Sequence, residues 1–109
     1  MGQAVIAIDD LGDDPLTAAA RFHAEWLPKV RDALEREPDN LVLSFKAGDY
    51  RQRNWRLAAV QELALTAAPV RVNAIAGQED SAAAKRTLGY LDNAPGVTGQ
   101  LLDQSEAPA

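Results

Sequence analysis

Short runs of consecutive apolar residues alternate along this chain with longer segments in which apolar residues recur at helical spacing. The runs Ala4–Ile8, Leu41–Phe45 and Val70–Ile75 are mostly aliphatic, which is typical of strands buried on both faces of a parallel sheet. A shorter apolar segment, Val97–Leu102, predicts a brief fourth strand. We therefore expect a sheet of three or four strands.

The first helix is expected between Leu16 and Leu34, where apolar residues follow the helical repeat. Asp14 is a suitable N-cap, and Pro15 suits the first helical position because the amide there needs no partner within the helix. Pro28 lies inside the same helix. Since proline lacks an amide hydrogen, we expect it to remove one backbone hydrogen bond and to bend the helix.

Two further helices are expected along the chain. One covers Trp55–Ala67 and follows a loop at 46–51. The other begins at an N-cap supplied by Asp80 or Ser81 and runs to about Leu91. Strands that alternate with helices predict an α/β sheet with right-handed parallel crossovers.

The composition fits one small acidic domain. We assign residues 1–104 of the 109 to a single domain and residues 105–109 to a flexible polar tail. A formal net charge of −5 leaves no basic surface for nucleic acid. Cysteine is absent, which excludes disulfides and cysteine-based zinc sites and suits a cytoplasmic protein. The first ten residues carry no basic region and no long apolar stretch, so we expect neither a signal peptide nor a membrane span.

Two polar features of the sequence are candidate sites. The acidic group Asp9, Asp10, Asp13 and Asp14 contains ligands for a divalent cation, but it lacks the alternating spacing of a calcium loop, so a solvated loop with an N-cap is favoured and no metal is expected. His23 is the single histidine. It lies on the apolar stripe of the first helix, which favours a packing or interface role over that of a base.

Two segments resemble the C-terminal half of short-chain dehydrogenases/reductases. The sequence PVRVNAIAG at 69–77 is similar to the family's (I/V)RVNA(I/V)xPG strand, and 91–102, with its VTGQ, is similar to the closing segment. Trp26–Pro28 and Leu41–Gly48 resemble the helix and strand that precede the family's catalytic serine. The resemblance extends over about residues 4–104. It implies a three-layer half-Rossmann domain of three to four parallel strands and three helices.

The family's nucleotide-binding motif has no counterpart in this chain. That motif is a glycine-rich turn in which the backbone approaches the pyrophosphate at a helix N-terminus. Gly12 stands alone among carboxylates that repel phosphate. The segment Gln78–Asp80 is also short where the family has a substrate lid. We therefore expect no cofactor to be bound by this chain alone.

The catalytic tetrad that the resemblance implies is mostly replaced. The asparagine position falls near Pro15, and the serine position falls near Phe45, beside Ser44. Tyr50 matches the tyrosine of YxxxK, but Asn54 stands in place of the lysine and cannot supply its positive charge. No catalytic residue is expected, with Tyr50 and Ser44 the weak candidates.

In the resembled family, the helices that correspond to 23–36 and 54–67 pack against their copies in another subunit. Large aromatic side chains would anchor such an interface. For the two tryptophans, an equally favoured alternative to this interface role is that each covers the edge of a small core. The candidate interface residues are His23, Trp26, Val30, Trp55 and Ala59.

Three functions follow from these features. The first is a non-catalytic protein, a pseudoenzyme, that acts as a structural or regulatory subunit by association, either with its own copy or with a dehydrogenase-like partner. The second is an accessory oxidoreductase subunit that uses Tyr50 with NAD(P) held by a partner chain. The third is a module that binds a small or regulatory ligand.

Overall fold

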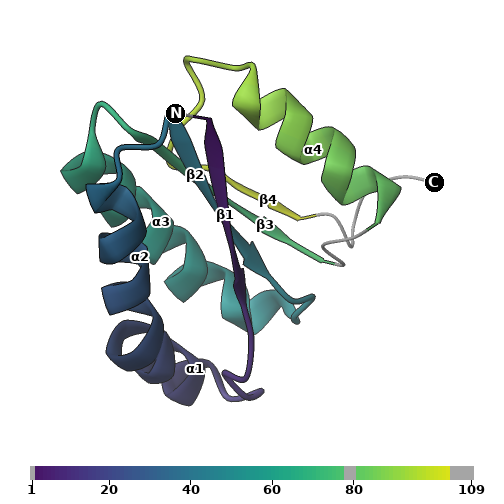
Figure 1. The fold of residues 1–109 in the computed structure, drawn as a ribbon. Helices are drawn as coiled ribbons and strands as arrows, with labels where there is room; N and C mark the ends of the chain where they lie inside the picture. The colour runs from purple at the N-terminus through teal and green to yellow at the C-terminus, as the bar shows by residue number, and fades with distance from the viewer. Residues whose placement is uncertain (1, 78–80, 104–109) are drawn as a thin grey trace.

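The computed structural model describes residues 2–77 and 81–103, which form one parallel sheet flanked by helices (Figure 1). The elements are β1 (Gln3–Ile8), α1 (Pro15–Arg21), η1 (Phe22–Trp26), α2 (Leu27–Glu35), β2 (Asn40–Phe45), η2 (Tyr50–Gln52), α3 (Arg53–Ala67), β3 (Arg71–Ala76), α4 (Ala82–Asp92) and β4 (Leu101–Asp103). The strand order is β1-β2-β3-β4, and all three pairings are parallel. The predicted α/β half-Rossmann architecture is confirmed. The fourth strand is shorter than predicted, and the tail at 105–109 lies outside the described residues.

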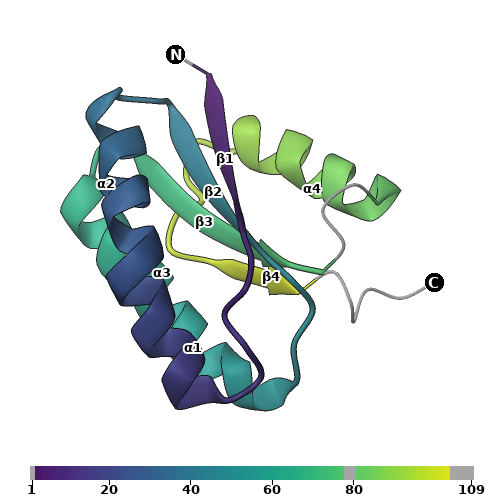
Figure 2. The same cartoon turned by 60° about the horizontal axis from the view of Figure 1, so that its bottom comes forward.

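The sheet separates two apolar cores because successive strand side chains point to opposite faces. The larger core contains Leu41, Leu43 and Phe45 of β2, packed against α1, η1, α2 and α3. The smaller core contains Val42 and Ile75, packed against α4. Figure 2 shows the three layers, with α4 alone on its face of the sheet.

The expectation of uniformly right-handed crossovers is wrong. Each strand from β1 to β4 is added on the same side of the one before it, yet α4 crosses one face while the other helices cross the opposite face (Figures 1 and 2). The β3–α4–β4 connection therefore has the opposite hand to the other two. Most parallel crossovers are right-handed, so this one needs specific contacts that hold α4 in place.

The first helix is continuous from α1 to α2 but contains a π-helical turn, η1, directly before Pro28. The amide of Leu27 donates to the carbonyl of Phe22, five residues earlier. Proline crowds the carbonyl of the preceding turn, and the wider π turn gives it room. The helix therefore contains, before Pro28, a π turn that the sequence analysis did not predict.

Side-chain caps begin the helices as the sequence predicted. Asp14 Oδ2 accepts a hydrogen bond of 3.0 Å from the amide of Thr17, and this bond lowers the pKa of Asp14. Ser81 caps α4 through the amide of Ala84, at 3.0 Å, while the alternative cap Asp80 lies outside the described residues. The loop expected at 46–51 is shorter than predicted, because η2 already begins at Tyr50.

Among residues 2–77 and 81–103, no helix combines the length and the apolar character that crossing a membrane requires.

Candidate functional site

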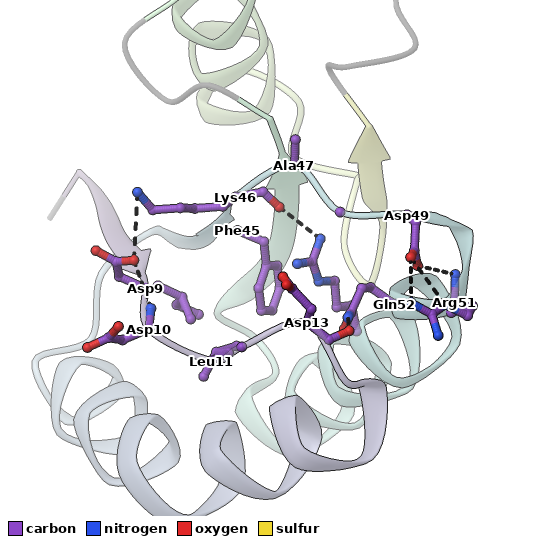
Figure 3. Close-up of a pocket in the computed structure, with 14 residues that line it drawn as sticks. Asp9, Asp10, Leu11, Asp13, Phe45, Lys46, Ala47, Asp49, Arg51 and Gln52 are labelled. Atoms are coloured by element: carbon purple, nitrogen blue, oxygen red, sulfur yellow. Dashed lines mark hydrogen bonds and ion pairs between the residues drawn. The ribbon is translucent and has the colours of Figure 1, made fainter.

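A cleft of about 510 Å³ opens at the carboxyl ends of β1 and β2 (Figure 3). The loop 9–13 after β1 forms one wall, and the loop 46–49 after β2 forms another. Gly12 turns the first loop toward α1 with a φ of 86°, a conformation that favours glycine. Ligands of parallel α/β sheets bind outside the carboxyl ends of the strands. This carboxyl-end cleft is therefore the candidate ligand site.

Acidic side chains outnumber basic ones around the carboxyl-end cleft. The charged lining residues are Asp9, Asp10, Asp13 and Asp49 against Lys46, Arg51 and Arg56. Lys46 Nζ lies 3.6 Å from Asp9 Oδ1, and Arg51 Nη2 lies 2.9 Å from Asp49 Oδ2. The hydrogen bond from Arg51 holds the pKa of Asp49 below its usual value. A pyrophosphate placed here would meet net repulsion.

The acidic residues of the loop 9–14 do not converge on one point, as the ligands of a metal centre do. In the described part of the chain, no three His, Asp or Glu side chains lie close enough together to hold a metal ion. Asp14 instead caps α1, and Asp9 pairs with Lys46.

The residues that the resemblance places at the family's catalytic positions lie in different environments. Pro15 is the first residue of α1, and Phe45 is buried at the end of β2 with its ring in the larger core. Ser44 is 3% exposed and points to the opposite face of the sheet. Tyr50 lies in η2 and is 87% exposed, and Asn54 is exposed at the start of α3. Of these residues, Phe45 alone lines the carboxyl-end cleft.

Phe45 joins the cleft to an aromatic cluster. Its ring centroid lies 5.9 Å from that of Phe22 and 5.6 Å from that of Trp55. The guanidinium carbon of Arg56 lies 4.7 Å from the Phe45 centroid, within cation–π distance. Burial lowers the pKa of Arg56, and the carboxylates of Asp103 and Asp49 act in the opposite direction.

Arg56 is the site residue that the sequence reasoning missed. It is 8% exposed and shares a buried stripe of α3 with Val60, Leu63 and Ala64. The signal that could have found it is a charged residue at helical spacing from apolar ones, a position that ordinarily holds another apolar side chain.

A second hollow, the helix groove, lies between η1–α2 and α3 and has a volume of about 430 Å³. Leu27, Ala58 and Leu63 are among its apolar lining residues. His23 also lines it and is exposed, with Nδ1 2.8 Å from the carbonyl oxygen of Ala19 and its ring edge-on to Phe22 at 5.3 Å. The groove therefore lies between the two helices that were expected to form an interface.

The predicted interface residues divide between surface and core. Trp26 is half-buried beneath Lys29, whose Nζ lies 4.3 Å from the ring centroid, and Trp55 is half-buried in the groove. Val30 is fully buried, and Ala59 is 7% exposed. These two belong to the protein's own core, while His23 and the tryptophans reach the surface.

A family model described as short chain dehydrogenase-like protein matches residues 6–104. The chain belongs to this family. No curated protein and no solved structure gives a significant match to it.

The most family-typical segment of this short chain dehydrogenase-like protein, RVNA, is structural. Arg71 Nη1 donates to the carbonyl oxygens of Leu91 and Ala94 at 2.7 and 2.8 Å, at the C-terminal end of α4. Asn73 is fully buried; its Nδ2 donates to Val97 O, and its Oδ1 accepts from the amide of Gln100, both at 3.0 Å. These bonds attach α4 and the 97–100 segment to β3, and so supply the contacts that its unusual crossover requires.

Proposed function

We propose that this short chain dehydrogenase-like protein is non-catalytic and acts as a structural or regulatory subunit through protein–protein association. The observation that carries the proposal is Phe45, which occupies the serine position and is 1% exposed inside an aromatic cluster. A side chain committed to the core cannot orient a substrate carbonyl. Asn54, at the lysine position, likewise offers no cation.

The charge around the carboxyl-end cleft supports the same proposal. Dinucleotide cofactors need backbone amides and positive potential around their phosphates. The cleft carries four carboxylates against three cations, and two of these cations are already paired. Without a bound dinucleotide, a dehydrogenase has no source or acceptor for its hydride.

Association is supported by two surfaces. The helix groove exposes the His23 ring and part of Trp55, which is an aromatic side chain of the kind that anchors interfaces. Strand β1 pairs with β2 on one side, and no described strand pairs with its other edge, where Val5 is 44% exposed. Open strand edges and apolar helix faces both favour association. The proposed partner is a second copy or a dehydrogenase-like protein.

The substitution Ala58→Glu tests association through the helix groove. Ala58 is exposed and lines the groove, so a carboxylate there would be desolvated by any partner helix. We expect at least about tenfold weaker association, because burying an unpaired charge costs several kcal/mol. Size-exclusion chromatography with light scattering at tens of micromolar measures it.

The matched control is Ala82→Glu, an exposed position at the start of α4 on the opposite face of the sheet. This variant should associate as the parent protein does. A parent protein that runs as a monomer at these concentrations, with no partner that co-purifies, would contradict the proposal.

The alternative function, an accessory oxidoreductase, rests on the accessibility of one phenol. Tyr50 is 87% exposed, so a partner chain that carries NAD(P) could approach it. Ser44 is buried and would have to be uncovered first. Fluorescence titration of the isolated chain with NADH and NADPH tests the argument from the missing glycine-rich turn: we expect no binding at micromolar concentrations, and binding there would contradict that argument.

A further inference from the structure

Arg56 is a buried cation with few partners. Its exposed fraction is 8%, and its one hydrogen bond to the described residues runs from Nη1 to the carbonyl oxygen of Lys46, at 3.0 Å. Its Nε is buried without a hydrogen-bond partner in the described ranges. An unsatisfied buried donor costs about 1–3 kcal/mol, and more when it is charged. Because the Arg56 guanidinium does not stabilise the fold through this donor, its retention is better explained by a ligand that it could bind.

The loop after β2 lies close against this guanidinium. Arg56 and Gly48 both line the carboxyl-end cleft. A Cβ atom at Gly48 would lie 3.0 Å from Gln52 Cγ, 3.2 Å from Nη2 of Arg56 and 3.3 Å from its Nη1. A side chain at position 48 would therefore crowd Arg56 where it lines the cleft.

Carboxylates without a cation face the same cleft. Asp9 and Asp49 are paired with Lys46 and Arg51. Asp10 and Asp13 also line the cleft, and neither forms an ion pair with the described residues. Figure 3 shows Asp10 and Asp13 on the loop after β1, among the residues that line the cleft. The unpaired charges are therefore one buried cation and two carboxylates.

We propose that the carboxyl-end cleft binds a small zwitterion of the amino-acid class. Arg56 holds the ligand's carboxylate through the part of its guanidinium that lines the cleft, and Asp13 and Asp10 hold its ammonium group. A phosphate, with its higher negative charge, would meet repulsion from these acids. The volume of about 510 Å³ and the apolar lining by Leu11 and Ala47 suit an aliphatic side chain. This proposal goes beyond the association function and does not depend on it.

The test uses L-leucine and three probes that each lack part of its charge pattern. 4-Methylpentanoate has the same carbon skeleton without the ammonium group, 3-methylbutylamine lacks the carboxylate, and inorganic phosphate carries only negative charge. Binding to the full-length protein is followed by ¹H–¹⁵N NMR titration. We expect leucine to bind at least about tenfold more tightly than each of the three, because each probe leaves at least one charged group of the cleft without its partner.

Two methionine variants of α3 localise the binding. Arg56→Met should weaken leucine binding at least about tenfold. Arg53→Met removes the same charge from the same helix, at an exposed position that does not line the cleft, and should leave binding unchanged. Without ligand, Arg56→Met should melt at the parent's temperature or above it, because an apolar chain replaces a buried, unpaired cation.

If Arg56→Met does not fold, Asp13→Asn takes its place, since Asp13 is exposed and should also bind leucine more weakly. Equal binding of leucine and 4-methylpentanoate, equal binding of phosphate, or no shifts with leucine would overturn the proposal. Light scattering reports association separately. A monomer that binds leucine would contradict only the association proposal, and an oligomer that ignores leucine would contradict only this one.

Discussion

Replacing Phe45 by serine, the residue type of the family's catalytic position, is expected to destabilise the protein by about 3–5 kcal/mol rather than to restore activity. The ring is 1% exposed and packs against Phe22, Trp55 and Arg56. Truncating it leaves a cavity and places a hydroxyl against an apolar cluster. Because small domains are stable by about 5–15 kcal/mol, a large part of the total would be lost. Urea denaturation followed by tryptophan fluorescence measures it.

Leu16→Ser is the control for this substitution. Leu16 is 84% exposed on α1, so its loss should change the free energy of unfolding by about 0.5 kcal/mol or less. A Phe45→Ser protein as stable as the parent would show that the aromatic cluster contributes little. It would also remove the main support for a non-catalytic role, since the site could then accept a serine freely.

Asn73→Ala is expected to destabilise the protein by about 2–4 kcal/mol. The side chain is fully buried and satisfies two backbone groups, the carbonyl of Val97 and the amide of Gln100. Alanine leaves both groups without this partner, and each buried unsatisfied group costs about 1–3 kcal/mol. Urea denaturation gives the change in the free energy of unfolding. Hydrogen exchange should show faster exchange at the amide of Gln100.

The comparison variant is Asn93→Ala. Asn93 is also an asparagine that bonds to backbone, through Nδ2 to Gly89 O at 2.9 Å, but it is exposed, so water replaces the lost bond. Its cost should be about 0.5 kcal/mol or less. If both variants lost the same stability, or if exchange at Gln100 stayed slow in Asn73→Ala, then Asn73 would not hold the 97–100 segment against β3.

Local sequence signals located the strands and helices because those signals act over a few residues. The apolar runs at 41–45 and 70–75 became β2 and β3 with shifts of one residue, and Asp14 caps the first helix as predicted. The first turn of α3 was missed because Arg53 and Asn54 interrupt the apolar pattern, although backbone hydrogen bonds continue through them. The π turn before Pro28 was also missed, since the sequence shows the proline but does not show which turn of the helix changes its hydrogen bonding.

Whether a candidate residue reaches a site or an interface depends on its burial, which the sequence shows less directly than it shows helices and strands. Val30 and Ala59 have the helical spacing of interface residues, but the same spacing also places residues in the core, and both lie there. Ser44 and Phe45 are neighbours in sequence and point to opposite faces of the sheet, so their one-residue separation decides which of them reaches the larger core. Arg56 is one of three charged residues on α3, and the sequence alone does not show which of them is buried.

The sequence by itself determined the α/β class and the family resemblance, because both depend on residue type at a fixed spacing. The tertiary structure decided the face on which α4 packs, through Arg71 and Asn73, which bond to residues about 20 or more positions away. It also decided that Arg56 lies buried at a cleft lined by carboxylates. Both outcomes depend on contacts between distant segments, and these exist only once the sheet has assembled.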